Sequence, residues 1–313
     1  MGVARDFIFF LSTKPAITNF IARKGMSLGF AQRFIPGETL DEVLAVAAQL
    51  NAQHRLVSLN HLGEHVSSER EANAAAENYK LMLEAINTHH LRGNISVKLT
   101  QLGLAFDRDL CRQLLEAIVE RAAAFNNVVE VDMEESAYTE DTVNIVASLA
   151  QRWSNVGVAL QAYLYRTERD LERLKSMGLK IRLVKGAYRE PRSVAYQRKA
   201  DVDENYRRLL DRLLQPPCRA AIATHDEKML AEAQRLIGER RLAPEAYEFQ
   251  MVYGIRRDLQ DRLVEDGYAL RIYLPFGRDW CPYFMRRLAE RPANTWFVIK
   301  SLIRERAASP DGR

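Results

Sequence analysis

Two adjacent arginines, Arg286 and Arg287, have the most evident chemistry in this sequence, because they follow the aromatic residues Tyr273, Trp280 and Tyr283. A guanidinium binds a carboxylate through two parallel hydrogen bonds, and aromatic rings can enclose the apolar part of a small zwitterion. The segment therefore indicates a carboxylate site with an aromatic wall. The alternative is a solvated helix face near the C-terminus, where cations interact favourably with the helix dipole.

A second group of polar residues falls mainly at the C-terminal ends of runs with the composition of β-strands. Its members are Lys98, Asp132, Gln161, Arg182, Lys185, Thr224, His225 and Gln250. Arg182 requires a partner, because an unpaired buried cation costs roughly several kcal/mol. Lys98 fits a ligand contact and an ion pair with Asp132 equally well. His225 has no second histidine at metal spacing, which favours a structural role and predicts no metal site.

The elements that must position these residues alternate along the chain. Short β-branched runs are separated by longer amphipathic stretches, which is typical of parallel strands joined by helices. The predicted strands span residues 56–62, 95–99, 128–133, 156–163, 180–185, 220–224, 247–252 and 270–274. Several are near-continuous apolar runs, as expected of strands covered on both faces.

This pattern predicts an α/β fold, a (β/α)8 TIM-type barrel with an N-terminal helical extension, and its active site at the C-terminal ends of the strands. An open doubly wound sheet is the alternative, but no GxGxxG motif follows any strand. Capping signals predict helix starts at Thr39, Ser68, Thr139, Thr167 and Asp226. We expect an extension over residues 1–38, the barrel over 39–305 and a disordered tail over 306–313.

Bulk properties exclude several other classes. The 313 residues suit one barrel, and the net charge of +4 comes without a polybasic block, so nucleic acid is not an expected partner. Cys111, Cys218 and Cys281 are far apart, which argues against a disulfide framework and favours a reducing, cytoplasmic compartment. The apolar run over residues 7–11 is too short to span a bilayer.

Over residues 39–305 the chain resembles the proline dehydrogenases, in particular the monofunctional bacterial type. The motifs that carry the resemblance are Arg182-Leu-Val-Lys-Gly-Ala-Tyr188, Ala223-Thr-His225, Glu248-Phe-Gln250, Arg271-Ile-Tyr-Leu-Pro275 and Tyr283-Phe-Met-Arg-Arg-Leu-Ala-Glu290. The resemblance implies a (β/α)8 barrel that holds FAD non-covalently. It also implies oxidation of L-proline to Δ1-pyrroline-5-carboxylate, the first step of proline catabolism to glutamate, by hydride transfer from C5 of the ring to flavin N5.

The resemblance assigns roles to individual residues. It implies that Arg286, Arg287 and Lys98 bind the proline carboxylate and that Tyr273 and Tyr283 pack around the ring. Val252 stands where many members have leucine, which makes that pocket wall slightly smaller, and Asn60 stands where an aspartate is frequent. Two residues are implied in catalysis, Asp132 behind the substrate and Arg182 beside flavin N5. The implied cofactor contacts are Met133, Gln161, Arg182, Lys185, Gly186, Ala187, Tyr188, Thr224, His225, Gln250 and Glu290.

Family members pass electrons to membrane quinone, so the resemblance implies peripheral contact with the inner membrane, and we expect it through the aromatic N-terminal segment. The sequence leaves the oligomeric state open, a homo-oligomer included. A Schiff-base lyase or aldolase on the same barrel, with Lys98 or Lys185 as nucleophile, is an alternative. The lyase or aldolase alternative assigns no function to the segment that contains Tyr273, Arg286 and Arg287. A binding protein without catalysis is the other alternative, and it predicts ligand affinity without flavin reduction.

Overall fold

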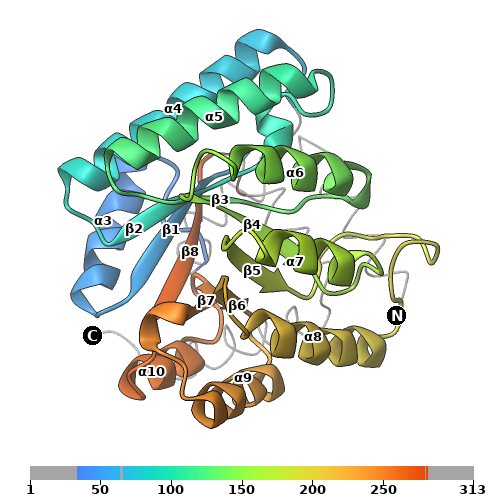
Figure 1. Cartoon of the computed structure of the whole chain (residues 1–313). Helices are drawn as coiled ribbons and strands as arrows, with labels where there is room; N and C mark the ends of the chain where they lie inside the picture. Colours follow the sequence, from blue (N-terminus) through green and yellow to red (C-terminus); the bar gives the residue numbers. More distant parts are fainter. Residues whose placement is uncertain (1–33, 64–65, 279, 281–313) are drawn as a thin grey trace, which may run out of the picture. The chain divides into compact units, whose positions relative to one another are not determined.

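Eight parallel strands close into a barrel (Figure 1). The computed structural model describes residues 34–63, 66–278 and 280. The strands are β1 Leu56–His61, β2 Gly93–Val97, β3 Val129–Val131, β4 Val156–Gln161, β5 Lys180–Val184, β6 Arg219–Ala223, β7 Tyr247–Val252 and β8 Leu270–Phe276. Each strand pairs with the next along the chain, and β8 returns to pair with β1 in a register that runs from Leu56 opposite Arg271 to His61 opposite Phe276. The predicted barrel is confirmed, and the doubly wound sheet is wrong.

Helices connect the strands and lie around the outside of the barrel (Figure 1). In the part of the chain that the structure describes, the α-helices are α3 Leu40–Ala52, α4 Glu69–Thr88, α5 Arg108–Ala124, α6 Ser136–Leu149, α7 Thr167–Lys175, α8 Lys199–Leu213, α9 Glu227–Arg240 and α10 Arg257–Glu265. The described residues also contain two short 3-10 turns, η2 Leu99–Leu102 and η3 Pro244–Ala246. Within the described ranges, no helix has the length and apolar character needed to cross a bilayer.

Two predicted capping boxes start helices, one of them fully formed. At α3 the Thr39 side chain accepts from the Glu42 N–H, and the Glu42 carboxylate accepts from the Thr39 N–H. At α4 the Ser68 hydroxyl accepts from the Glu71 N–H, but the Glu71 carboxylate accepts from the N–H of Ser67 instead of Ser68. Both arrangements satisfy donors that the first helical turn leaves unpaired.

Of the other predicted N-caps, Asp226 is confirmed at the start of α9. Thr139 is wrong, because α6 begins three residues earlier at Ser136 and buries Thr139 inside the helix. Thr167 is the first helical residue of α7 and follows the cap residue Arg166. The capping chemistry of a threonine is local, but packing against the barrel decides which turn becomes helical.

The apolar core lies between the barrel and its helices. Alternate strand residues, such as Val57 and Leu59 in β1 or Val129 and Val131 in β3, are fully buried in one cluster with the inner faces of the helices. The strands are therefore covered on both faces, as predicted. The face of the strands that packs against the helices is apolar. The residues between these positions point into the barrel, and many of them are polar.

Candidate active site

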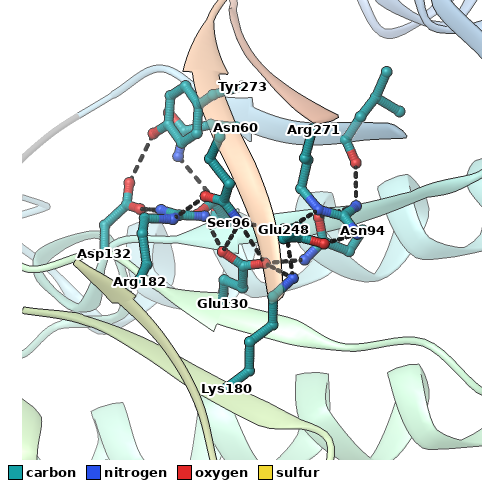
Figure 2. Close-up of polar contacts among 12 residues, drawn as sticks. Asn60, Asn94, Ser96, Glu130, Asp132, Lys180, Arg182, Glu248, Arg271 and Tyr273 are labelled. Carbon is teal, nitrogen blue, oxygen red and sulfur yellow. Dashed lines mark hydrogen bonds and ion pairs between the residues drawn. The ribbon is translucent and has the colours of Figure 1, made fainter. Parts of the chain in front are cut away.

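Polar and charged side chains fill the barrel where many barrels carry branched aliphatic residues. Lys180 of β5 reaches Glu248 of β7, with 2.8 Å between Nζ and Oε1, and Arg182 of β5 reaches Asp132 after β3, with 2.6 Å between Nη1 and Oδ1. These pairs join strands that are not neighbours, so they cross the barrel interior. Figure 2 shows that the interior residues form one connected network.

Asp132 is the centre of the part of this network nearest the C-terminal ends of the strands. Its Oδ1 accepts from Ser96 Oγ at 2.8 Å and from Arg182 Nη1 at 2.6 Å. Its Oδ2 accepts from Lys98 Nζ and from the Tyr273 hydroxyl, both at 2.7 Å. The structure thus brings together four of the predicted site residues: Arg182 from β5, Tyr273 from β8, and Lys98 and Asp132 from the positions directly after β2 and β3.

The ionisation states in this cluster follow from burial and pairing. Burial alone would raise the pKa of Asp132, but the charges of Lys98 and Arg182 hold the pKa at about 2. For Lys98, burial lowers the pKa, but attraction to Asp132 outweighs it and the pKa stays well above its usual value. Asp132 is therefore a carboxylate and Lys98 an ammonium at neutral pH.

These states argue against a lysine nucleophile. A Schiff-base lysine needs a depressed pKa, and Lys98 has a raised one. The other candidate, Lys185, has its Nζ engaged by the carboxylates of Asp203 and Asp226. The ion pair between Lys98 and Asp132, one of the two interpretations of Lys98, is present. An ammonium has three N–H donors, and among the described residues Lys98 Nζ donates one of them, to Asp132 Oδ2.

Arg182 is held at all three of its nitrogens. Nε donates to Gln250 Oε1 at 2.6 Å, Nη1 to Asp132 Oδ1 and Nη2 to the carboxylate of Glu130. The guanidinium carbon lies 5.5 Å from the centre of the Tyr273 ring, a distance at which a cation is attracted to an aromatic face. The expectation that this buried charge has partners is confirmed.

A second group of predicted residues lies at the C-terminal ends of β5, β6 and β7. Lys185 Nζ is 2.7 Å from Asp226 Oδ2, and the Asp226 N–H donates to Thr224 Oγ1 at 3.1 Å. His225 Nε2 accepts from the N–H of Val252 at 2.9 Å, which ties the end of β6 to the end of β7. His225 thus has a hydrogen-bond partner within the fold.

The remaining described candidates lie at neighbouring strand ends. Gln161, the last residue of β4, donates from Nε2 to the backbone oxygen of Glu134 at 2.8 Å. Gly186 has a φ of 110°, and a Cβ there would lie 2.3 Å from Cδ1 of the Tyr163 ring. Met133 is buried, and Ala187 and Tyr188 are partly exposed. Tyr283, Arg286, Arg287 and Glu290 lie outside the described residues, as do residues 1–33 of the predicted extension and the predicted tail.

Several residues of the interior network were not predicted as site residues, among them Glu130, Lys180 and Ser96. Polar residues continue toward the N-terminal ends of the strands, so the expectation that they lie mainly at the C-terminal ends is wrong. Two-residue alternation was the available signal, because Glu130 precedes Asp132 and Lys180 precedes Arg182 by two positions, which directs both members of each pair into the barrel.

A cavity of about 390 Å³ opens at the other end of the barrel. Its lining includes Asn94, Lys180, Glu248 and Arg271, at or near the starts of their strands. In barrels of this type that end contributes stability, whereas chemistry is done at the C-terminal ends. We therefore assign the candidate active site to the Asp132 cluster and not to this cavity.

A closed (β/α)8 barrel with a charged cluster at its C-terminal strand ends defines the class as a TIM-type barrel enzyme. The family model described as Proline dehydrogenase matches residues 43–300. The chain belongs to this family of oxidoreductases.

Relatives support this assignment over nearly the full chain. The sequence is 37% identical over 301 residues to Proline dehydrogenase 1 of Bacillus subtilis, with 96% of this chain and 99% of the relative covered. It is 40% identical over 303 residues to Proline dehydrogenase 2 of the same organism, with 97% and 100% covered. For the proline dehydrogenase of Deinococcus radiodurans the identity is 34% over 305 residues, with 96% and 98% covered.

A solved structure has the same fold. Proline utilization A (PutA) from Bdellovibrio bacteriovorus, inactivated by N-propargylglycine, matches with a TM-score of 0.78 and 25% identity. The match covers 83% of this chain and 32% of that chain, so this chain corresponds to about a third of the larger protein.

Proposed function

We propose that this chain oxidises L-proline to Δ1-pyrroline-5-carboxylate with non-covalently bound FAD and that the electrons pass on to a quinone. The observation that supports this function most strongly is the cluster in which Asp132 binds Lys98, Arg182 and Tyr273 at the strand ends. Such a cluster presents a fixed ammonium and a fixed phenol ring beside each other. A carboxylate on a small ring fits that pair of groups.

In this proposal Arg286, Arg287 and Lys98 bind the proline carboxylate, and Tyr273, Tyr283 and Val252 enclose the ring. Fixing a substrate in a reactive orientation contributes up to about 7–11 kcal/mol in ideal cases. Asp132 does not act as the base, because its pKa is about 2 and four donors already occupy its oxygens. It orients Lys98, Arg182 and Tyr273, and proline enters with its amine already neutral.

The residues at the ends of β4 to β7 fit a dinucleotide cofactor in their donor chemistry. An ammonium (Lys185) and a hydroxyl (Thr224) suit phosphate and ribose oxygens, and the amides of Gln161 and Gln250 suit the edge of a flavin ring. The other residues proposed to hold FAD are Met133, Arg182, Gly186, Ala187, Tyr188, His225 and Glu290. When bound, FAD supplies the hydride acceptor, flavin N5. Arg182, a fixed cation in a water-poor interior, favours electron density placed next to it.

An anaerobic absorption spectrum tests the whole proposal. The purified protein, loaded with FAD, should show flavin absorbance that bleaches on addition of L-proline. A flavin band that L-proline leaves unchanged would contradict proline oxidation, and failure to retain FAD would contradict the cofactor assignment. Cyclopentanecarboxylate has the ring and carboxylate of proline without its nitrogen, so it should bind without bleaching.

The carboxylate assignment predicts a selective effect of Arg286→Lys and Arg287→Lys. Lysine cannot reproduce bidentate pairing, so affinity for cyclopentanecarboxylate should fall by about tenfold or more, which corresponds to one lost charge-assisted hydrogen bond. FAD content should stay unchanged. Arg235→Lys, which alters an exposed ion pair with Glu232, is the control and should change neither quantity. Equal losses of ligand and FAD would refute the assignment.

The quinone proposal has its own test. Deletion of residues 1–11, which include the apolar run, should lower quinone reductase activity in liposomes and liposome binding, with proline-dependent bleaching retained. Unchanged activity and binding would exclude a role of this segment in membrane contact.

A further inference from the structure

Glu130 lies in the middle of the barrel and is 1% exposed. Its Oε1 accepts from Lys180 Nζ at 2.6 Å and from Asn94 Nδ2 at 3.0 Å, and its carboxylate also accepts from Arg182 Nη2. Gln250 Nε2 lies 3.2 Å from Oε2. All of these partners are side chains that project into the barrel from β2, β5 and β7.

Glu130 acts on Arg182 in two ways. It binds Nη2 directly, and it also accepts from the Gln250 amide group whose Oε1 holds Arg182 Nε. A guanidinium is planar, so contacts at Nε, Nη1 and Nη2 together determine its plane. Asp132 supplies only the contact at Nη1, and the other two depend on Glu130 or on its neighbour Gln250.

Glu130 also balances charge. The described network that contains Arg182 joins four cations, Lys98, Lys180, Arg182 and Arg271, to three carboxylates, Glu130, Asp132 and Glu248. Burial alone would raise the pKa of Glu130, but Arg182, Lys180 and Arg271 hold the pKa well below its usual range, so the group is ionised. Without its charge, two carboxylates would face four cations.

We propose that Glu130 is a positioning residue for proline oxidation, because it fixes the plane of the Arg182 guanidinium and offsets part of its positive charge. The inference rests on the proposed function, in which Arg182 lies beside the flavin. The contacts of Glu130 that carry this role are with protein side chains, and not with substrate or cofactor. Its effect passes through Arg182 and is therefore expected on the oxidation step and on the flavin potential, and not on the binding of the carboxylate.

The variants that test this are Glu130→Gln, Glu130→Asp and, as a matched control, Glu248→Gln. Glu248 is also buried, and its loss removes the same charge from the same network. It shares with Glu130 the contacts with Lys180 and with the Gln250 amide, but it makes no contact with Arg182 in the described structure, so the comparison isolates the direct contact of Glu130 with Arg182 Nη2. Each FAD-loaded variant is mixed anaerobically with saturating L-proline, and the rate constant for bleaching of the flavin absorbance is measured. The dissociation constant of cyclopentanecarboxylate is measured separately for each variant.

For Glu130→Gln we expect the bleaching rate constant to fall at least tenfold, with a change of less than threefold in analogue affinity. Glu248→Gln should change both by less than threefold. Glu130→Asp keeps the charge but has a shorter side chain, so its bleaching rate constant should lie between those of wild type and Glu130→Gln. If Glu130→Gln does not fold, Glu130→Asp is compared with wild type in its place. A bleaching rate constant of Glu130→Asp within threefold of the wild-type value would then overturn the proposal.

The midpoint potential of the bound flavin, measured without proline, gives an independent readout. Loss of the Glu130 charge should shift it to a more positive value, and by more than the loss of the Glu248 charge. Equal shifts, or equal losses of rate, in Glu130→Gln and Glu248→Gln would overturn the positioning role. If L-proline does not bleach the flavin of the wild-type protein, the proposed function itself is refuted. If bleaching is normal in every variant, only the role of Glu130 is refuted.

Discussion

At the scale of single residues, the candidate site depends on carboxylates that bind cations and do not exchange protons. Asp132 receives four hydrogen bonds, and its pKa of about 2 shows that the ionised form is strongly favoured. A buried ion pair is weak evidence for stability, because removing charges from water costs free energy. The pairs do fix geometry, since each charged group must face its partner, and fixed geometry is what the proposed hydride transfer requires.

The Asp132→Asn variant should lose a specific part of the pH dependence of stability. The pKa of Asp132 is lowered from 3.8 to about 2, so the carboxylate stabilises the fold above about pH 4, and this contribution disappears as pH falls toward 2. A shift of nearly two units corresponds to roughly 2 kcal/mol.

Urea unfolding at several pH values between 2 and 5 measures this effect. The free energy of unfolding of Asp132→Asn should depend on pH less steeply than that of wild type. Glu77→Gln, which breaks an exposed pair with Lys80, should leave the slope unchanged. A slope in Asp132→Asn as steep as in wild type would contradict the assignment of Asp132 as a stabilising ionised group.

At the scale of elements, the loops after the strands carry the local constraints. After β5 the backbone at Gly186 has a φ of 110°, a conformation that L residues rarely adopt, and the ring of Tyr163 occupies the space of a Cβ. Gly178, in the turn before β5, also has a positive φ of 70°, but nothing lies within 4 Å of its Cβ position. An alanine at either position would have a strained backbone, but only an alanine at position 186 would also overlap another side chain. Comparing the two variants therefore distinguishes the cost of backbone strain from the cost of steric overlap.

Gly186→Ala should destabilise the protein more than Gly178→Ala. Both variants place an L residue at positive φ, which costs about 1–2 kcal/mol. Gly186→Ala must also displace the Tyr163 ring, which adds about 1–3 kcal/mol. Thermal or urea unfolding of the two variants measures the difference. Equal destabilisation would show that the Tyr163 ring moves away at no cost.

At the scale of the whole molecule, barrel closure assembles the network from distant parts of the chain. Arg271 in β8 shows this most clearly. Its Nε is 2.7 Å from Glu248 Oε1 in β7, and its Nη1 donates to the backbone oxygen of Val57 in β1 at 2.8 Å and to Asn94 Oδ1 in β2 at 3.1 Å. One guanidinium thus holds the last strands to the first ones at the N-terminal end of the barrel.

Arg271→Met should therefore weaken the whole barrel. It leaves Glu248 buried with one cation fewer, and breaking a buried pair costs about 3–5 kcal/mol. Arg219→Met is the matched control, because Arg219 is exposed at the same end of the barrel and lines the same cavity. The free energy of unfolding should fall by this amount only in Arg271→Met. A similar small loss in both variants would contradict a role of Arg271 in closure.

Much of the architecture could be predicted because its causes are local. β-branched runs and amphipathic stretches determined eight strands and their connecting helices, and the observed strand bounds differ from the predicted ones by a few residues. The cap at Thr39 was predictable for the same reason, since both partners lie within four residues. Motifs that stay together in the chain, such as the run from Arg182 to Tyr188, determined the family.

The sequence by itself thus determined the barrel, the family and the residue types at the strand ends, because all of these depend on neighbours along the chain. Only the tertiary structure decided which charges pair. Alternation directs Glu130, Arg182 and Gln250 into the barrel, but their contacts cross from β3 to β5 to β7, up to 120 positions apart in the chain. Register and closure set those distances, and no local pattern encodes them. For that reason Lys98 had two open interpretations and Glu130 had none until the strands were placed.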